Sequence, residues 1–469
     1  MNTKLKPERL LLLYIPWILS LLIAANPVLS YFMAWLGSFF IFLISIKGFI
    51  KPIPDDLKFS EQLMRPLFLP HIIFAGYMCS TSIFYFMDIQ GYNYFEPPAD
   101  NYLIDYAQLE LVAQCQRYYC LAHAAFITGI IAFMNYEQKP EYYLNIRDNA
   151  SFIMISAIVL LPFSALFLVI PGLRQFYFQF QTLSFIAGTL AFAFAIPLKK
   201  PLNTVISAVI FFTGVYQAFL SGFKEPILIS ILVLGIFLYP FYKKLVIITF
   251  IPLIIALFLL LPIYAQVFRA NAWAGEENIE TASDIAIDAA LNQKDEEAAE
   301  TNWEFLTNRL SEIGMFTIYV NSTPSRIDYY GFDLVEQAVI VIIPRAFWPN
   351  KPFTEDMVME RVYNAGVIVR GTKVSAKPPT IVDAYLSGGA IGIALTLFIY
   401  GALMQTLSVK AEKLFGGYII GTAFIFSGLF QIMWRGNSFE FLSNSIIWSF
   451  ISMLVIFYVL KYFRIIKEV

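Results

Sequence analysis

The sequence predicts an all-α polytopic membrane protein with about twelve transmembrane helices and one large outer loop that contains short helices. Of its 469 residues, 58% are hydrophobic and only 14% are charged, whereas a typical soluble domain is about 25% charged. The apolar residues lie in runs close to the ~20 residues that a helix needs to cross a bilayer. Basic residues also alternate between successive connections, as the positive-inside rule describes. These observations exclude an ordinary soluble enzyme and a disordered chain.

Twelve apolar segments are candidates for the spans. The first follows a short basic stretch, residues 1–9, and could be taken for a signal peptide. Because no small-residue cleavage site follows it, we expect it to be a retained span. The segments lie at roughly 10–26, 28–46, 67–87, 108–134, 150–171, 176–197, 202–221, 225–242, 245–267, 383–408, 417–434 and 441–462.

The Lys and Arg residues of alternate connections indicate the orientation. Cytoplasmic loops carry an excess of these residues, so we expect both termini in the cytoplasm. The opposite connections are acidic, nearly uncharged or hold one isolated cation. The basic connections are the N-terminal tail, 47–65, 139–147, 199–200, 243–244, 410–413 and the C-terminal tail.

Composition also excludes nucleic-acid binding and argues against a metal site. The chain has 32 Lys and Arg against 34 Asp and Glu, so it lacks the basic excess that nucleic-acid binding needs. Its three cysteines have no metal-ligand or disulfide spacing. His71 and His123 lie singly in predicted spans, where we expect satisfied bundle residues rather than catalysts. We therefore expect no metal and no nucleic-acid partner.

The spans divide the chain into a membrane bundle at 1–268, an outer loop at 269–382 and a second membrane part at 383–469. A loop this long is usually functional or disordered. Its first half, 276–304, is rich in acids and predicts a solvated acidic flap, with weak helical periodicity over 282–291.

The second half of the outer loop is patterned. Leu306, Leu310, Ile313 and Val320 recur at helical spacing and predict an amphipathic helix on the membrane or on the bundle. Residues 334–343 are apolar but too few to span, which is typical of a re-entrant or interfacial segment.

Cations on the outer face run against the positive-inside bias. The segment 361–377 holds four of them and no acid. One alternative is that they pair with acids of the loop or with outer-leaflet phosphates. The other is that they bind an anionic ligand, since Arg binds phosphate bidentately and Lys acts as a point charge. As a group we expect them to bind an anionic ligand. The candidates are Arg174, Lys224, Arg269, Arg345, Lys351, Arg361, Arg370, Lys373, Lys377 and Arg435.

A proline-rich turn at 343–352 displays Arg345, Trp348 and Lys351. Three prolines fix φ there and stop any helix. A rigid frame with two cations and an indole suits a pyrophosphate joined to a sugar. The alternative is a buried structural turn.

Polar residues also lie within the spans. Glu110, Gln114 and Arg117 share one helix face, which predicts either an ion pair or the wall of a substrate cavity. Asp383 begins the tenth span. It is either an acid favoured by the helix dipole or a general base for a hydroxyl.

Three motifs and the overall layout resemble the Wzy-type oligosaccharide repeat-unit polymerases, which build O-antigen and exopolysaccharide chains. Residues 220–224 resemble the family's Ser-Gly-x-Arg turn, with Lys224 in the basic position. Residues 344–352 resemble its Pro-Arg…Trp-Pro-x-Lys-Pro element. Asp383-Ala384-Tyr385, with Gly388 and Gly392, resembles its acid-x-Tyr…Gly…Gly motif.

The resemblance implies a GT-C-like, lipid-diphosphate-dependent glycosyltransferase of the bacterial inner membrane. It would polymerise undecaprenyl-diphosphate-linked repeat units at the periplasmic face, without a cofactor, and could work with a chain-length regulator. It implies Arg345 and Lys351 for the diphosphate and Asp383 as the base. Lys224, Arg174 and Arg435 would assist, and Tyr385 and Trp348 would stack on sugars.

Two other functions share parts of this layout. An O-antigen ligase uses the same lipid donor, but that family is expected to show a His in the late outer loop, and none occurs between Arg269 and Pro379. A transporter or flippase would show repeats and charges near mid-membrane. No clear internal repeat is present.

Overall fold

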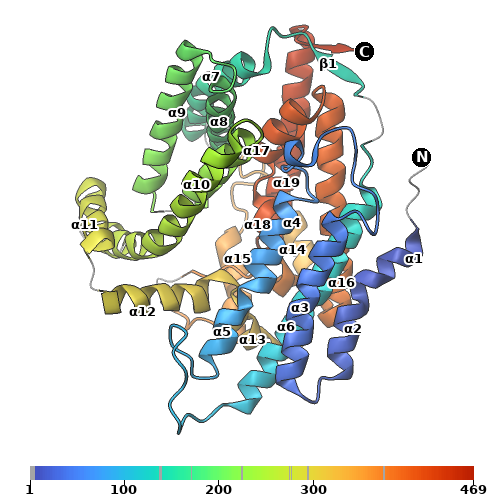
Figure 1. The fold of residues 1–469 in the computed structure, drawn as a ribbon, viewed down its shortest axis with the longest axis vertical. Helices are drawn as coiled ribbons and strands as arrows, with labels where there is room; N and C mark the ends of the chain where they lie inside the picture. The colour runs from blue at the N-terminus through green and yellow to red at the C-terminus, as the bar shows by residue number, and fades with distance from the viewer. Residues whose placement is uncertain are drawn as a thin grey trace.

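The computed structural model describes residues 6–136, 140–170, 172–222, 225–273, 275, 277–292, 295–372 and 375–469, with the side chains of 295–297 left undescribed. The predicted all-α class is confirmed (Figure 1). Every segment predicted as a span is helical over most of its length. That the chain crosses the membrane twelve times, and in which orientation, remains a prediction. Among the described residues, eight helices are long and apolar enough to cross a membrane: Pro27–Ile46, Leu69–Asp88, Asn149–Val169, Arg174–Ala195, Pro201–Leu220, Glu225–Ala272, Thr380–Leu414 and Phe439–Tyr462.

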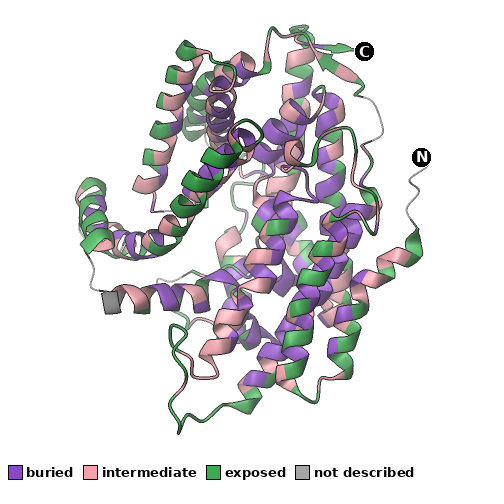
Figure 2. Cartoon of the chain, in the orientation of Figure 1, coloured by how far each residue is buried: buried purple, intermediate pink, exposed green. Residues whose placement is uncertain are grey.

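Helices α6 (Tyr106–Phe133) and α16 (Thr380–Leu414) form the centre of the main bundle. They cross closely at two glycines. A Cβ on Gly129 would lie 2.1 Å from the carbonyl oxygen of Phe398, and one on Gly401 would lie 2.0 Å from that of Phe126. Figure 2 shows that both helices carry many of the buried residues. The main bundle also contains α1 (Pro7–Leu10), η1 (Leu11–Tyr14), α2 (Ile15–Leu22), α3 (Pro27–Ile46), η2 (Phe59–Glu61), α4 (Leu69–Ile73), η3 (Phe74–Ser80) and α5 (Ser82–Asp88).

A second helical group lies beside the main bundle (Figure 1). It consists of α7 (Asn149–Val169), α8 (Arg174–Ala195), α9 (Pro201–Leu220) and α10 (Glu225–Ala272). Many apolar side chains of α7, α9 and α10 are exposed, as expected for helices that face lipid.

Helix α10 is a hairpin of two packed halves. Its backbone leaves helical geometry at Tyr242. Ile231 and Leu261 share one buried cluster, although a straight helix would place them about 45 Å apart. A Cβ on Gly235 would lie 2.9 Å from the ring of Phe250. The predicted segments 225–242 and 245–267 therefore lie side by side.

The outer loop is largely helical. It contains α11 (Ile279–Asn292), α12 (Asp295–Phe305), η4 (Leu306–Leu310), α13 (Ile313–Ser322), α14 (Asp333–Ile342) and α15 (Thr354–Ala365). The acidic segment is not a free flap, because Ala282 and Ala286 of α11 pack against Tyr264 and Phe268 of α10. Small side chains on one face let the two helices approach.

The amphipathic pattern at 306–320 corresponds to two elements rather than one helix. The π-helical turn η4 ends at Leu310, and α13 begins at Ile313. Phe316 of α13 stacks on Tyr119 of α6 at 5.6 Å between ring centroids. Between the two alternatives, the apolar face therefore lies on the bundle and not on the membrane.

Helix α16 is interrupted near its beginning. Gly388 and Gly389 leave helical geometry, and Gly389 has a φ of 61°, which favours glycine. Gly388 and Gly389 therefore interrupt the helix, whereas the close crossing with α6 occurs further along, at Gly401. The chain ends with η5 (Ile419–Phe426), α17 (Ser427–Leu429), α18 (Ile432–Arg435) and α19 (Phe439–Tyr462), and β1 (Tyr142–Leu144) pairs with β2 (Ile466–Glu468).

Candidate functional site

Three arginines from distant parts of the chain converge where α10 meets the main bundle. We call the group the arginine site. Each member either contacts another member or interacts electrostatically with one. The site consists of Tyr77, Glu225, Arg269, Arg309, Glu312 and Arg435.

Arg435, the last residue of α18, lies at the centre of the site. Its Nη2 donates to Oε1 of Glu312 at 3.0 Å and to the hydroxyl of Tyr77, and its Nη1 lies 3.7 Å from Oε2 of Glu225. The guanidinium also covers the Tyr77 ring at 4.7 Å. With 42% of its side chain exposed, Arg435 is held in place and still open to a ligand.

Arg269 joins the site from the end of α10. Its Nε and Nη2 donate to the carbonyl oxygen of Gly222 at 3.3 and 3.1 Å. Its guanidinium covers the ring of Trp273 at 4.8 Å. Arg309 is close enough for the two positive charges to repel each other. Three guanidinium groups against two carboxylates leave the arginine site with a surplus of positive charge.

The backbone of the site is unusual at three points. Tyr77 lies in the π-helical segment η3 and Arg309 in η4, and the Tyr77 hydroxyl donates to the Arg309 carbonyl at 3.1 Å. Glu312 has a φ of 54°. Short π-helical segments are frequent at functional sites, and strained non-glycine residues cluster there as well.

Glu312 is a carboxyl with a perturbed affinity for protons. Burial raises the pKa of Glu312, and the nearby Arg435 and Arg309 only partly offset that effect. A carboxyl with a raised pKa beside a cationic centre suits proton transfer.

Arg361 and Asp383 form a buried ion pair, completed by Glu440. Arg361 donates from Nε and Nη2 to the two oxygens of Asp383 at 2.8 Å each, and from Nη1 and Nη2 to Glu440 at 2.7 and 2.8 Å. The backbone N–H of Phe439 donates to Asp383 as well. The side chains of Asp383 and Glu440 are fully buried and that of Arg361 is 1% exposed. This geometry holds the outer loop to α16 and α19 and leaves Asp383 no open contact with a substrate.

The two cations of the proline-rich turn donate hydrogen bonds to nearby backbone carbonyl oxygens. Arg345 donates to the carbonyl oxygens of Pro349 and Pro352 at 3.3 and 2.9 Å. Lys351 donates to the carbonyls of Val341 and Ile343 at 2.9 and 2.7 Å and so caps the end of α14. Burial, together with Arg345, lowers the pKa of Lys351. Trp348 is 38% exposed.

The remaining predicted cations of the loop mostly pair with loop acids, one of the alternatives that the sequence leaves open. Arg370 pairs with Glu360 at 2.6 Å and Lys377 with Glu355 at 3.4 Å. Arg174 is exposed at the start of α8. Lys224 and Lys373 lie outside the described residues.

The polar stripe of α6 does not form an internal ion pair among its described contacts. Arg117 donates to the hydroxyl of Ser30 at 2.8 Å, and Glu110 is exposed. Tyr385 is buried and donates to the carbonyl of Thr323 at 2.7 Å, so its ring lies among neighbouring aromatics rather than against a sugar site.

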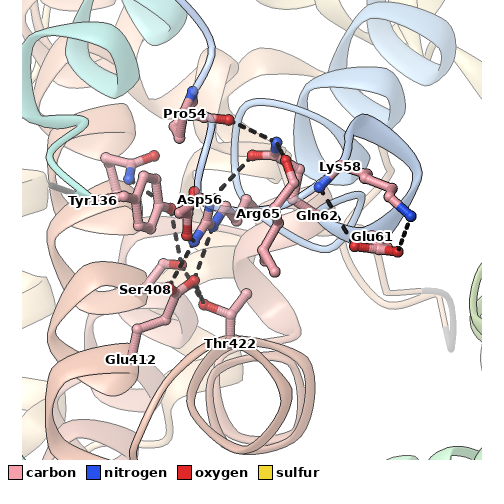
Figure 3. Close-up of polar contacts among 12 residues, drawn as sticks. Pro54, Asp56, Lys58, Glu61, Gln62, Arg65, Tyr136, Ser408, Glu412 and Thr422 are labelled. Carbon is pink, nitrogen blue, oxygen red and sulfur yellow. Dashed lines mark hydrogen bonds and ion pairs between the residues drawn. The ribbon is translucent and has the colours of Figure 1, made fainter. Parts of the chain in front are cut away.

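Another buried arginine lies at the opposite end of α16 (Figure 3). Arg65 donates to Glu412 at 3.0 and 2.9 Å, to Asp56 at 2.8 and 2.6 Å and to Gln62 at 3.0 Å. Its guanidinium covers the ring of Tyr136 at 3.7 Å. In the sequence, Arg65 is only one basic residue of a connection.

Several of these residues carry no sequence signal of a site. Arg309, Glu312, Tyr77 and Glu440 belong to none of the motifs, and their partners lie far along the chain. His71 and His123 are also not isolated, because their Nε2 atoms lie 2.7 Å apart. Among the described residues, no group of three His, Cys, Asp or Glu side chains is placed to hold a metal ion.

Comparison with known proteins gives one match. A family model described as a domain of unknown function (DUF8712) matches residues 15–468. No curated protein matches the chain, and no solved structure matches it.

Proposed function

We propose that this chain, which belongs to the DUF8712 family, is a membrane glycosyltransferase that polymerises lipid-diphosphate-linked oligosaccharide repeat units. The observation that supports the proposal best is the arginine site, where Arg435 binds Glu312, a carboxyl with a raised pKa, and where Arg309 and Arg269 lie nearby. A diphosphate leaving group needs several cations, and arginines bind phosphate oxygens in a bidentate manner.

The position of the site suits a substrate that arrives within the bilayer. Arg269 and Glu225 come from α10 of the second helical group, and Arg435 and Tyr77 come from the main bundle. A lipid-linked substrate could reach this junction sideways while its diphosphate meets the arginines. Lys224 directly precedes Glu225 in the sequence.

In the proposed reaction, a hydroxyl oxygen of the incoming repeat unit attacks the anomeric carbon of the growing chain. The bond between that carbon and the diphosphate oxygen breaks, and the lipid diphosphate leaves with the bond electrons. Arg435 and Arg309 stabilise the charge that develops on it. Glu312 accepts the proton of the attacking hydroxyl. We assign this role to Glu312 rather than Asp383, because Arg361 and Phe439 occupy both Asp383 oxygens.

The reaction would take place at the periplasmic face of the bacterial inner membrane, with both termini in the cytoplasm. The donor and acceptor would be undecaprenyl-diphosphate-linked glycans, and a chain-length regulator is a further proposed partner. The cationic site and the apolar helices support this setting.

The decisive experiment uses the purified protein in lipid nanodiscs with a synthetic undecaprenyl-diphosphate oligosaccharide. A ladder of chain lengths is expected on a gel. Arg435→Ala and Arg309→Ala should each lose the ladder while keeping the thermal transition of the parent protein. Arg326→Ala is the matched control, because Arg326 is an exposed cation of the same loop outside the site.

The outcomes separate the candidate functions. A ladder that persists in both site variants would exclude the arginine site, and a single addition of finished glycan to another lipid would indicate a ligase. Movement of the lipid across the bilayer without any glycosyl transfer would indicate a transporter.

A further inference from the structure

Helix α14 (Asp333–Ile342) has two apolar faces. Leu334, Ala338 and Val341 are buried, and this face packs against α19. Val335 and Val339, about a third of a turn around the helix from that face, are 45% and 58% exposed. The helix has ten residues, about 15 Å of length, which is half the thickness of the hydrocarbon core of a bilayer.

Exposed aromatic residues flank this helix on both sides. Phe332, which precedes it, is 87% exposed, and Phe347 and Phe353, in the turn that follows, are 80% and 66% exposed. Trp348 is 38% exposed in the same turn. Large exposed apolar side chains are thus concentrated within about twenty residues of the sequence, and where such side chains form one patch they mark an interaction surface.

The contacts of the turn place it level with the outer end of α8. A Cβ on Gly172, in the connection between α7 and α8, would lie 2.6 Å from the backbone nitrogen of Ala346. Trp448 of α19 donates to the Ile342 carbonyl at 2.8 Å and packs on Phe176 of α8, with ring centroids 5.2 Å apart. Because Phe176 is the third residue of α8, the end of α14 lies at the boundary of the spans and not far beyond it.

The turn is rigid and carries positive charge. Lys351 caps the last carbonyls of α14, and Arg345 is bonded to two carbonyls of the turn and covers the Phe353 ring at 4.4 Å. Arg174 is exposed on the adjacent end of α8. Aromatic side chains beside exposed cations match the interface of a bilayer, where rings lie among headgroups and cations meet phosphates.

We infer that residues 332–353 form an interfacial anchor that lies in the outer leaflet of the membrane. Val335, Val339 and Phe347 contact acyl chains near the headgroups, and Arg174 and Arg345 lie at the level of the lipid phosphates. The occupant is lipid rather than a partner protein, because the segment packs at the ends of α8 and α19, which are both apolar enough to cross a membrane, and because cations lie beside it. This anchor is independent of the proposed glycosyltransferase activity.

The test measures the depth of two positions in the membrane. Val339→Cys and Phe347→Cys are labelled separately with an environment-sensitive fluorophore in full-length protein in nanodiscs. The three native cysteines are buried and an unsubstituted sample measures their background labelling. Ile248→Cys, at a 70% exposed position of α10, provides the lipid reference, and Asp356→Cys, at an exposed position of α15, provides the aqueous reference.

Labels at 339 and 347 should be quenched strongly by lipids with a spin label near the headgroup. Their quenching by aqueous iodide should be several-fold weaker than at position 356. Iodide quenching equal to that at position 356 at both sites would overturn the anchor. Protection from iodide without any quenching by spin-labelled lipids would overturn it too, because it would mean that protein covers the surface.

Discussion

Arg361 and Asp383 hold the outer loop against the beginning of α16 through two hydrogen bonds of 2.8 Å, with both side chains buried. Glu440 binds the same guanidinium from α19. At the other end of α16, Arg65 binds Glu412 and Asp56 in the same way. The helix is therefore clamped at both ends by an arginine between two carboxylates.

Removal of Arg361 should strongly destabilise the protein. Arg361→Ala leaves Asp383 and Glu440 buried without a cation, and breaking a buried pair on one side costs about 3–5 kcal/mol. We expect a large drop in melting temperature in detergent, measured by tryptophan fluorescence. Arg370→Ala, which removes an exposed pair, should change it little. An unchanged melting temperature in Arg361→Ala would refute the clamp.

The clamp at Arg65 should behave in the same way. Arg65→Ala removes five hydrogen bonds and two cation–π contacts at once. Lys58→Ala is the control from the same connection, because the Lys58–Glu61 pair is exposed and such pairs contribute at most about 1 kcal/mol. Equal thermal unfolding of the two variants would show that the Arg65 network is not needed for stability.

The crossing of α6 and α16 depends on glycine. In Gly401→Ala, the added methyl group would meet the backbone of Phe126, so the helices must move apart at a cost of about 1–3 kcal/mol. Gly76→Ala provides the comparison, because no atom beyond its own neighbouring residues and helix backbone lies within 4 Å of its Cβ position. Gly401→Ala should therefore melt at a lower temperature than Gly76→Ala. Equal melting temperatures would argue against a close crossing of α6 and α16 at Gly401.

Glu312 should give both stability and activity a dependence on pH. Its pKa in the folded protein is raised above the ordinary value of 4.5, so the folded state binds more protons than the unfolded state. This contribution is fully present below pH 4.5 and is lost as pH rises through the raised pKa. Glu312→Gln should remove that slope in melting temperature against pH.

The same substitution tests the proposed base. If ionised Glu312 accepts the proton, polymerisation should rise with pH through its raised pKa, and Glu312→Gln should lose both the rise and most of the rate. Gel ladders at several pH values measure it. A variant that keeps the parent rate and pH profile would exclude Glu312 as the base.

The sequence by itself determined the all-α class and the positions of the long apolar helices, because apolar runs are local properties. Even the hairpin of α10 follows from two runs separated by Lys243 and Lys244. The short helix α14 was likewise predictable as a segment too short to span.

Only the tertiary structure decided which charged residues meet. In the sequence, Arg361 is one of four cations in a segment that contains no acid. In the structure, Asp383 and Glu440 neutralise it from later parts of the chain. Arg269, Arg309 and Arg435 are separated by 40 residues or more and share no motif, yet they converge. Side chains on separate helices meet according to how the helices cross, and neither periodicity nor composition encodes that crossing.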